Sequence, residues 1–252
     1  MSRLDGCRVV MTGPAGGIGS LVAQRLRARR AHVTGVVRAA CAWCDESLIT
    51  DLGDQEALAA LAQSLAARQV DILVNLAGLQ YFGPIEDQSA DRIALGYTVN
   101  LVAPAILASA VVPQMIARRD GQIVNIGSVM GAIPYPYFTA YSSAKAGLKA
   151  LSQALRRELS GRGITVTHIA PRAVKTAAIA GAIERFMTLA KMQADRADIV
   201  ADRIVDAIEA RASDVSIGLP ERIFTQLNAT WPAAVDRGLA RQIATARSMF
   251  AG

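Results

Sequence analysis

The amino-acid sequence predicts an α/β protein with a doubly wound parallel β-sheet in a three-layer αβα sandwich. Short apolar runs of strand character alternate with longer segments of helical periodicity along most of the chain. Each run is apolar throughout, as is typical of strands in a parallel sheet covered on both faces. A glycine-rich turn connects the first run to the first helix. Right-handed crossovers between such elements produce a Rossmann-type fold.

Strands and helices follow in a regular order. The strands are predicted at residues 7–11, 32–37, 48–50, 70–75, 122–126, 164–170 and 215–217. The first helix carries Ile18, Leu21, Val22 and Leu26 at helical spacing, and the others are predicted at residues 54–68, 91–118, 141–160 and 197–211. The second and third strands leave no room for a proper helix, so that crossover is short or irregular. Pro104 is a point at which the long helix can lose its regularity.

Length and composition indicate a single domain that spans residues 1–252. Of the 252 residues 52% are apolar, ample for a core, and 19% are charged, too few for a disordered chain. The formal net charge is +6, but basic residues such as Arg25, Arg27 and Arg29 are spread over helices. We interpret them as solvated helix faces and expect no nucleic-acid partner. Because we find no N-terminal signal pattern and no apolar run long enough to span a bilayer, we expect a cytoplasmic protein.

Residues 220–252 are predicted to form an amphipathic helical appendage beyond the last strand. Its arginines and Trp231 are compatible with three roles. It can cover a substrate pocket, pack on a partner subunit in a homodimer or homotetramer, or make peripheral contact with a membrane surface. The three roles remain open at the level of the sequence.

The three cysteines are Cys7, Cys41 and Cys44. The last two form Cys-Ala-Trp-Cys, a spacing found in metal half-sites and redox pairs. A structural zinc site needs about four ligands, and Cys7, His32 and His168 lie in separate strand-like runs. We therefore interpret the pair as two cysteines in a short loop and predict neither a metal site nor a disulfide framework.

Glycines 13, 17 and 19 lie between the first strand and the first helix. Glycines at such a point let the chain turn tightly and let a pyrophosphate approach the amides at the helix N-terminus. No Lys-Ser/Thr pair ends the motif, which disfavours the phosphate loop of an NTPase. The alternative is a plain glycine-rich turn, but the position directly after the first strand favours dinucleotide binding.

Tyr141 and Lys145 are four residues apart in a predicted helix, so both side chains project from one face. An ammonium beside a phenol favours the phenolate and is expected to lower the tyrosine pKa toward neutrality. Such a tyrosine can exchange a proton with a carbonyl or alcohol oxygen. The pair is weak evidence alone, and gains weight from the glycine turn and from Ser128 upstream.

Together these residues give the chain a resemblance to the classical short-chain dehydrogenase/reductase family. Thr12-Gly13-x-x-x-Gly17-Ile18-Gly19 matches its cofactor turn, and Asn75-Leu76-Ala77-Gly78 is similar to its Asn-Asn-Ala-Gly motif. Asn100, Ser128, Tyr141 and Lys145 match its catalytic tetrad, with Ser128 thirteen residues before Tyr141. The resemblance covers roughly residues 8–176, and its motifs occur jointly and in order.

The resemblance implies a role for each member of the tetrad. Tyr141 is expected to be the general acid in reduction and the general base in oxidation. Lys145 is expected to lower the tyrosine pKa and to hold the nicotinamide ribose. Ser128 is expected to hydrogen-bond the substrate oxygen, and Asn100 to anchor a water that links Lys145 to solvent. Taken singly, each has a structural alternative: a strand-end cap for Ser128, a helix irregularity for Asn100 and a solvated charge for Lys145.

The residue after the second strand bears on the choice of cofactor. Family members that prefer NAD have an acidic residue at the end of this strand, where the chain has Val37 followed by Arg38. An arginine can pair with a 2′-phosphate, so we predict NADP(H) as the preferred cofactor, with NAD(H) as the alternative. The resemblance places Asp51 and Leu52 beside the adenine ring. Gly16 occupies the place of a second basic residue often found in NADP-preferring members.

The loop after the sixth strand departs from the family pattern. The family's Pro-Gly pair is Pro171-Arg172 in this chain, and arginine loses the backbone freedom of glycine. Val174 and Thr176 still match the Val-x-Thr that follows. We therefore expect Pro171, Val174 and Thr176 to contact the cofactor.

Two segments at the carboxyl ends of strands, residues 129–138 and 177–192, are expected to contact the substrate. They carry large apolar and aromatic side chains: Met130, Ile133, Tyr135, Tyr137, Phe138, Phe186, Met187, Leu189 and Met192. This set favours a small, hydrophobic ketone, aldehyde or alcohol as substrate. The alternative is that many of them pack the core or a subunit interface.

The leading hypothesis is an NADP(H)-dependent carbonyl reductase or alcohol dehydrogenase. A second is a non-catalytic dinucleotide sensor with the same fold, against which the complete tetrad argues. A third, an NAD-dependent dehydratase or epimerase of the extended branch, is disfavoured because the chain has no room for a sizeable substrate domain.

Overall fold

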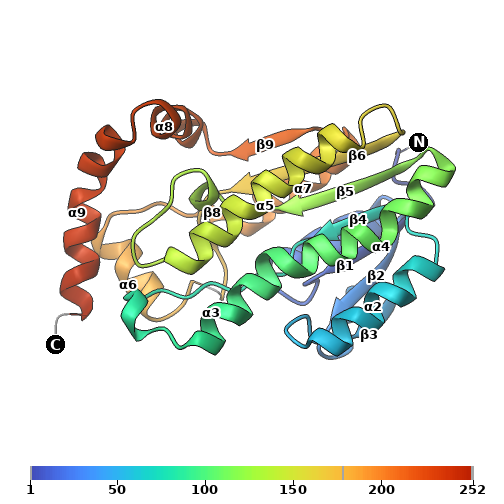
Figure 1. Ribbon diagram of the computed structural model, residues 1–252, viewed down its shortest axis with the longest axis horizontal. Helices are drawn as coiled ribbons and strands as arrows, with labels where there is room; N and C mark the ends of the chain where they lie inside the picture. The colour runs from blue at the N-terminus through green and yellow to red at the C-terminus, as the bar shows by residue number, and fades with distance from the viewer. Residues whose placement is uncertain (1, 178, 251–252) are drawn as a thin grey trace.

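Seven parallel strands form one sheet in the order β3-β2-β1-β4-β5-β6-β9 (Figure 1). The computed structural model describes residues 2–177 and 179–250. The strands are β1 (Arg8–Thr12), β2 (His32–Val37), β3 (Glu46–Ile49), β4 (Ile72–Asn75), β5 (Gly121–Ile126), β6 (Ile164–Pro171) and β9 (Asp214–Ile217). The order reverses between β1 and β4, and in doubly wound sheets a ligand binds at the carboxyl edge beside this switch point. The predicted fold class is confirmed.

Helices cover both faces of the sheet and produce two separate cores. On one face α1 (Gly17–Ala28) and α7 (Ala197–Glu209) pack on β1, with Met11, Val22 and Ile204 fully buried. On the other face lie α2 (Gln55–Ala67), α4 (Ala103–Arg118) and α5 (Thr139–Glu158). Leu73 and Leu107 are fully buried there. The three-layer sandwich follows from these two apolar faces.

The predicted helix 91–118 is three consecutive helical segments rather than one. They are α3 (Ala90–Tyr97), a π-helical segment (Thr98–Val102) and α4. The irregularity therefore precedes Pro104, which lies in the first turn of α4, where a missing N–H is tolerated. The π segment contains Asn100, so the helix irregularity and the candidate catalytic residue coincide.

Among the described residues, one stretch, residues 90–118, is long and apolar enough by length and composition to cross a membrane. The prediction that no apolar run reaches that length was therefore wrong. Leu107, Val111 and Met115 of this stretch are fully buried against the sheet, as in the core helix of a globular domain.

Residues 38–45 connect β2 to β3 without a helix, as predicted. Asp45 holds the end of this connection. Its carboxylate accepts a hydrogen bond from the amide of Val33 at 2.8 Å and pairs with Arg27 at 2.9 Å.

The chain beyond β6 crosses the carboxyl edge of the sheet. It forms the short parallel pair β7 (Val174–Lys175) and β8 (Asp195–Arg196), with α6 (Ala182–Leu189) between them. The sequence did not predict these elements. The predicted appendage is two helices, α8 (Leu219–Thr230) and α9 (Pro232–Phe250), while residues 251–252 lie outside the described range. Figure 1 shows α9, in red, beside α6 at the side toward which the β5 and β9 arrows point.

Candidate active site

A cavity of about 850 Å³ lies at the carboxyl edge of the sheet. Most of the predicted site residues line it: Gly13, Gly17, Ile18, Gly19, Arg38, Asp51, Leu52, Ala77, Gly78, Ser128, Tyr141, Lys145, Pro171, Val174 and Thr176. Asn75 and Asn100 are buried behind its wall. The structure therefore brings together the glycine turn and three members of the predicted tetrad.

The glycine turn brings the backbone of β1 against that of the segment after β4. Gly13 has φ +73, and a β-carbon there would lie 2.9 Å from the backbone of Ala77. A β-carbon on Gly19 would overlap the carbonyl oxygen of Gly13. Thr12 Oγ1 accepts hydrogen bonds from the amides of Leu76 and Ala77, both at 3.0 Å. The glycines thus permit the two backbone segments to approach closely, and the hydrogen bonds of Thr12 stabilise this approach. The sequence analysis did not predict this role of Thr12.

Ser128 and Tyr141 both line the cavity. Ser128 follows β5, where its hydroxyl accepts from the amide of Met130 at 3.1 Å, and its side chain acts to lower the pKa of the neighbouring Tyr141 phenol. Tyr141 lies in the first turn of α5, and Lys145 one turn later on the same face. The Lys145 ammonium lies 5.8 Å from the centroid of the Tyr141 ring and donates to the carbonyl of Ile126 at 2.9 Å.

Burial controls the protonation of both groups. It lowers the pKa of Lys145 from 10.5 to about 8. It raises the pKa of Tyr141, against the opposing effect of the hydrogen bond with Ser128. The expected lowering of the tyrosine pKa by Lys145 is therefore wrong for the protein alone. Loss of solvent around the phenol is the largest effect on this pKa, and the side chain that favours the phenolate is Ser128.

Asn100 lies behind Gly78 in the π segment. Its Nδ2 donates to the carbonyl oxygens of Leu79 at 2.6 Å and Gly96 at 2.8 Å. Its Oδ1 is buried and has no hydrogen-bond partner within the described residues. A β-carbon on Gly78 would lie 3.0 Å from this oxygen and 3.6 Å from Lys145 Nζ. An unpartnered acceptor thus faces the same small space as the lysine ammonium.

Asn75 does not reach the cavity. Its Nδ2 donates to Asn125 Oδ1 at 2.8 Å, and Asn125 Nδ2 donates to Ser152 Oγ at 2.9 Å. Ser152 in turn donates to the carbonyl of Leu148 at 2.7 Å. This buried chain ties β4 and β5 to α5, the helix that carries Tyr141. The sequence analysis missed Asn125 and Ser152, although a polar residue inside the apolar run of β5 was a visible signal.

Polar groups and two cysteines lie at the end of the cavity beside β2. Arg38 is exposed at its edge, and Asp51 Oδ1 accepts from the amide of Gly53 at 2.8 Å. Cys41 and Cys44 are free thiols beside this end. Burial and the neighbouring Cys41 raise the pKa of Cys44 to about 12. No group of three or more potential metal ligands occurs in the part of the chain that the structure describes.

The opposite end of the cavity is apolar. Of the predicted substrate contacts, five line it: Met130, Phe138, Phe186, Met187 and Met192. The other four are outside its lining: Ile133, Tyr135, Tyr137 and Leu189. Ile179 and Ile183 line it as well and were not predicted. Helical periodicity in the segment after β7 would have favoured Ile183.

Arg172 lines the cavity and pairs with Asp195 through two contacts. Its Nε and Nη2 lie 2.9 and 2.6 Å from the two carboxylate oxygens. The amide of Asp195 also donates to the carbonyl of Ala173 at 2.8 Å. The arginine that replaces the family's glycine therefore closes the base of the segment that contains α6.

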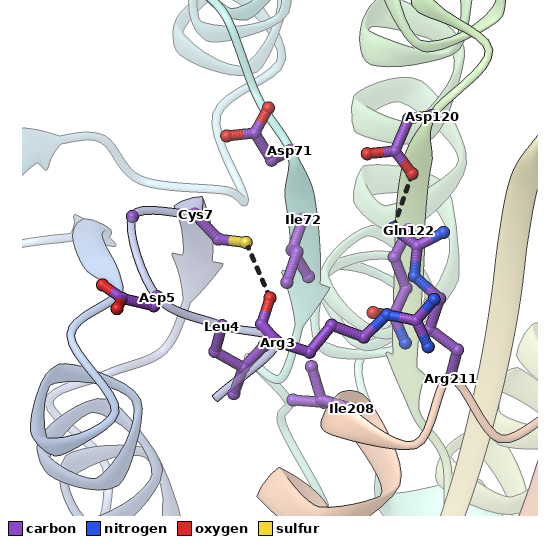
Figure 2. Close-up of a pocket in the computed structure, with 11 residues that line it drawn as sticks. Arg3, Leu4, Asp5, Cys7, Asp71, Ile72, Asp120, Gln122, Ile208 and Arg211 are labelled. Atoms are coloured by element: carbon purple, nitrogen blue, oxygen red, sulfur yellow. Dashed lines mark hydrogen bonds and ion pairs between the residues drawn. The ribbon is translucent and has the colours of Figure 1, made fainter. Parts of the chain in front are cut away.

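A second cavity, of about 230 Å³, lies at the amino ends of β1, β4 and β5 (Figure 2). Its carboxylates pair with arginines: Asp120 with Arg211 at 2.6 Å, Asp71 with Arg8 at 3.3 Å and Asp5 with Arg30 at 3.3 Å. Burial raises the pKa of the Cys7 thiol, which donates to the carbonyl of Arg3 at 3.4 Å. All three carboxylates of the lining are paired, so we assign no chemistry to this cavity.

The residues of the large cavity fit an extended dinucleotide. The glycines let the turn pack closely against neighbouring protein atoms, and Gly16, the N-cap residue of α1, has no side chain to cap the amides of the first turn. The polar end with Arg38 and Asp51 and the end with Ser128, Tyr141 and Lys145 belong to one continuous cavity. This arrangement matches a ligand with a charged diphosphate between two ring systems.

Fold and site together define a Rossmann-type protein with a candidate dinucleotide site. The family model described as short chain dehydrogenase matches residues 8–185. The chain belongs to the short-chain dehydrogenase/reductase family.

Known relatives agree with this assignment. Nodulation protein G of Rhizobium meliloti is 34% identical over 194 residues, which are 70% of this chain and 77% of that protein. The chain spans 62% of the length of another curated relative and 54% of a third. A short-chain dehydrogenase from Sphingobium yanoikuyae in complex with NADPH has a TM-score of 0.75 at 27% identity, covering 91% of this chain and 95% of that one. A Beutenbergia cavernae protein assigned as an NAD(P)-dependent gluconate 5-dehydrogenase, with bound NADP, has a TM-score of 0.74 at 30% identity, covering 84% and 95%.

Proposed function

We propose that this protein transfers a hydride between NADP(H) and the carbonyl or secondary alcohol group of a small, hydrophobic substrate. The observation that carries the proposal is the position of Ser128 and Tyr141. Both hydroxyl-bearing side chains line the same cavity as the glycine turn and the apolar side chains. A substrate oxygen placed at these hydroxyls has its carbon skeleton among Met130, Phe186 and Met192.

The chain's own residues handle the proton. When bound, the dinucleotide supplies or accepts the hydride. Tyr141 donates its proton to the substrate oxygen in reduction and takes it back in oxidation. Ser128 hydrogen-bonds the same oxygen and stabilises the charge that develops on it. Lys145 carries a positive charge below about pH 8, which favours the tyrosinate as the proton leaves. The unpartnered Asn100 Oδ1 supports a role in passing protons between Lys145 and solvent.

The preference for NADP(H) rests on Arg38. Its side chain is exposed at the edge of the cavity, directly after β2, where a 2′-phosphate can reach it. The Sphingobium and Beutenbergia neighbours were crystallised with NADPH and NADP, which supports the proposal by similarity.

The mechanism is tested by measuring NADPH and NADH consumption against a panel of carbonyl compounds. Wild type should reduce apolar ketones, and Tyr141→Phe should lower kcat/KM by about 100-fold or more, because proton transfer is lost while binding remains. Undiminished turnover in Tyr141→Phe refutes the mechanism. Dinucleotide binding without turnover of any compound would favour the sensor hypothesis.

The cofactor preference is tested by Arg38→Asp. The variant should favour NADH, since a carboxylate repels the 2′-phosphate and accepts from a ribose hydroxyl. The ratio of kcat/KM for the two cofactors measures this change. An unchanged ratio contradicts the assignment of Arg38 and leaves the role of Tyr141 intact.

A further inference from the structure

Five aromatic rings close the apolar end of the cavity in two layers. We call them the aromatic wall: Phe82, Tyr137, Phe138, Phe186 and Phe250. Phe138 and Phe186 line the cavity and form the inner layer. Phe82 packs behind them, with its ring centroid 4.8 Å from that of Phe138 and 4.9 Å from that of Phe186. The outer layer therefore begins at Phe82.

Phe250, the last residue of α9, completes the outer layer. Its ring meets Phe82 edge-on at 5.2 Å and stacks on Tyr137 at 5.6 Å with an interplanar angle of 13°. These geometries are the favoured ones for aromatic pairs. The wall thus joins the loop after β4, the loop after β5, α6 and the C-terminal helix.

The C-terminal helices are held in place on the wall by further contacts. Ala246 of α9 is fully buried in the same cluster as Phe186. Asn228 of α8 donates from Nδ2 to the carbonyl of Ala132 at 2.9 Å, which fixes α8 to the segment after Ser128. Figure 1 shows α9 standing across the end of the molecule beside α6.

Tyr137 adopts an unfavourable backbone conformation that contacts of the aromatic wall stabilise. Its φ is +64, in the left-handed region that a residue with a β-carbon seldom adopts. Its carbonyl accepts from the amide of Gly83 at 2.9 Å, while its ring stacks on Phe250. The unfavourable conformation is therefore tied to contacts with the segment after β4 and with α9.

We propose that Phe82 and Phe250 determine how far an apolar substituent of the substrate can extend from the reacting carbon. The C-terminal helix is then a specificity element of this chain's own active site. Of the three roles open for residues 220–252, this proposal selects the covering of the substrate pocket. The substrate class is a ketone or secondary alcohol with a short apolar substituent on the side of Phe138 and Phe186. The inference rests on the proposed function, because it presumes a hydrophobic carbonyl substrate.

The test compares kcat/KM for butyl methyl ketone and octyl methyl ketone in wild type, Phe250→Ala and Phe82→Leu. Phe224→Ala is the matched control, since Phe224 is an exposed aromatic residue on α8, 52% accessible. The ratio for octyl over butyl ketone should rise by about tenfold in both wall variants, the lower end of what one methylene group contributes in an apolar pocket. The control should keep the wild-type ratio.

The outcomes separate this inference from the proposed function. If wild type reduces ketones but both wall variants keep its ratio, the aromatic wall does not set substrate length and the inference is overturned. If wild type reduces no ketone, the proposed function fails, and titration with the apolar dye 8-anilinonaphthalene-1-sulfonate decides the inference. Tighter dye binding by Phe250→Ala than by Phe224→Ala supports an opened wall, and equal binding overturns it.

Discussion

Replacement of the buried Lys145 by methionine should change how the stability of the protein depends on pH. Methionine has a similar length and no charge, so the substitution removes the ionisable group with little change in volume. Lys145 is 4% exposed, and burial lowers its pKa from 10.5 to about 8. The folded state therefore gives up this proton at a lower pH than the unfolded chain does.

The magnitude follows from the two pKa values. A fall from 10.5 to about 8 corresponds to about 3 kcal/mol of unfavourable free energy for holding the charged lysine in the folded protein. This penalty is fully present below about pH 8. It declines from there to pH 10.5, because over this range the unfolded state binds more protons than the folded state. Relative to Lys145→Met, wild type should gain about 2 kcal/mol or more by about pH 10.

Urea unfolding of both proteins at several values between about pH 7 and pH 10 measures the difference. Ala150→Ser, an exposed substitution on the same helix, controls for changes that remove no ionisable group. Its free energy of unfolding should stay parallel to that of wild type. Parallel curves for wild type and Lys145→Met would refute the argument that burial lowers the pKa of Lys145.

Two further predictions concern the cavity. Gly19→Ala should weaken NADPH binding by about tenfold or more, because its β-carbon would overlap the Gly13 carbonyl oxygen. A fluorescence titration measures the affinity, with Gly16→Ala as the control, since a β-carbon there would lie 3.4 Å from the same oxygen. Equal affinities of the two variants would contradict the prediction. Asp195→Asn should raise KM for the carbonyl substrate by about threefold to tenfold with a smaller effect on kcat, because the pair with Arg172 closes the base of the α6 segment. Asp195→Glu should recover part of the loss, and a KM unchanged in Asp195→Asn would show that the pair does not position this segment.

The fold and the centre of the site were predictable because they depend on local patterns. Apolar runs and helical spacing were sufficient for the parallel sheet, and the glycine turn was identified from its place after β1. The family resemblance placed Ser128 and Tyr141 in one site, and in the structure both residues line the same cavity.

What the sequence missed depends on tertiary surroundings. Burial of the phenol raises the pKa of Tyr141, and a spacing pattern in the sequence does not show that burial. Asn75 was assigned to the cofactor, but its amide is turned toward Asn125 inside the protein. Leu189 was assigned to the substrate pocket, yet it faces outward and is 49% exposed.

The π-helical segment at Thr98–Val102 makes the length of this helix as important as its composition. An α-helix turns by about 100° per residue, so one additional residue in the π turn rotates α3 relative to α4 by that angle. In an α-helix the carbonyl of Gly96 would accept from the backbone amide of residue 100, and in this structure the side-chain amide of Asn100 donates to it. Loss of one residue between 98 and 102 would restore regular winding, and either Asn100 or the buried face of α4 with Leu107 would then point in the wrong direction. Insertions and deletions within the π turn should therefore be absent from active relatives, even where surface residues of the same helix differ.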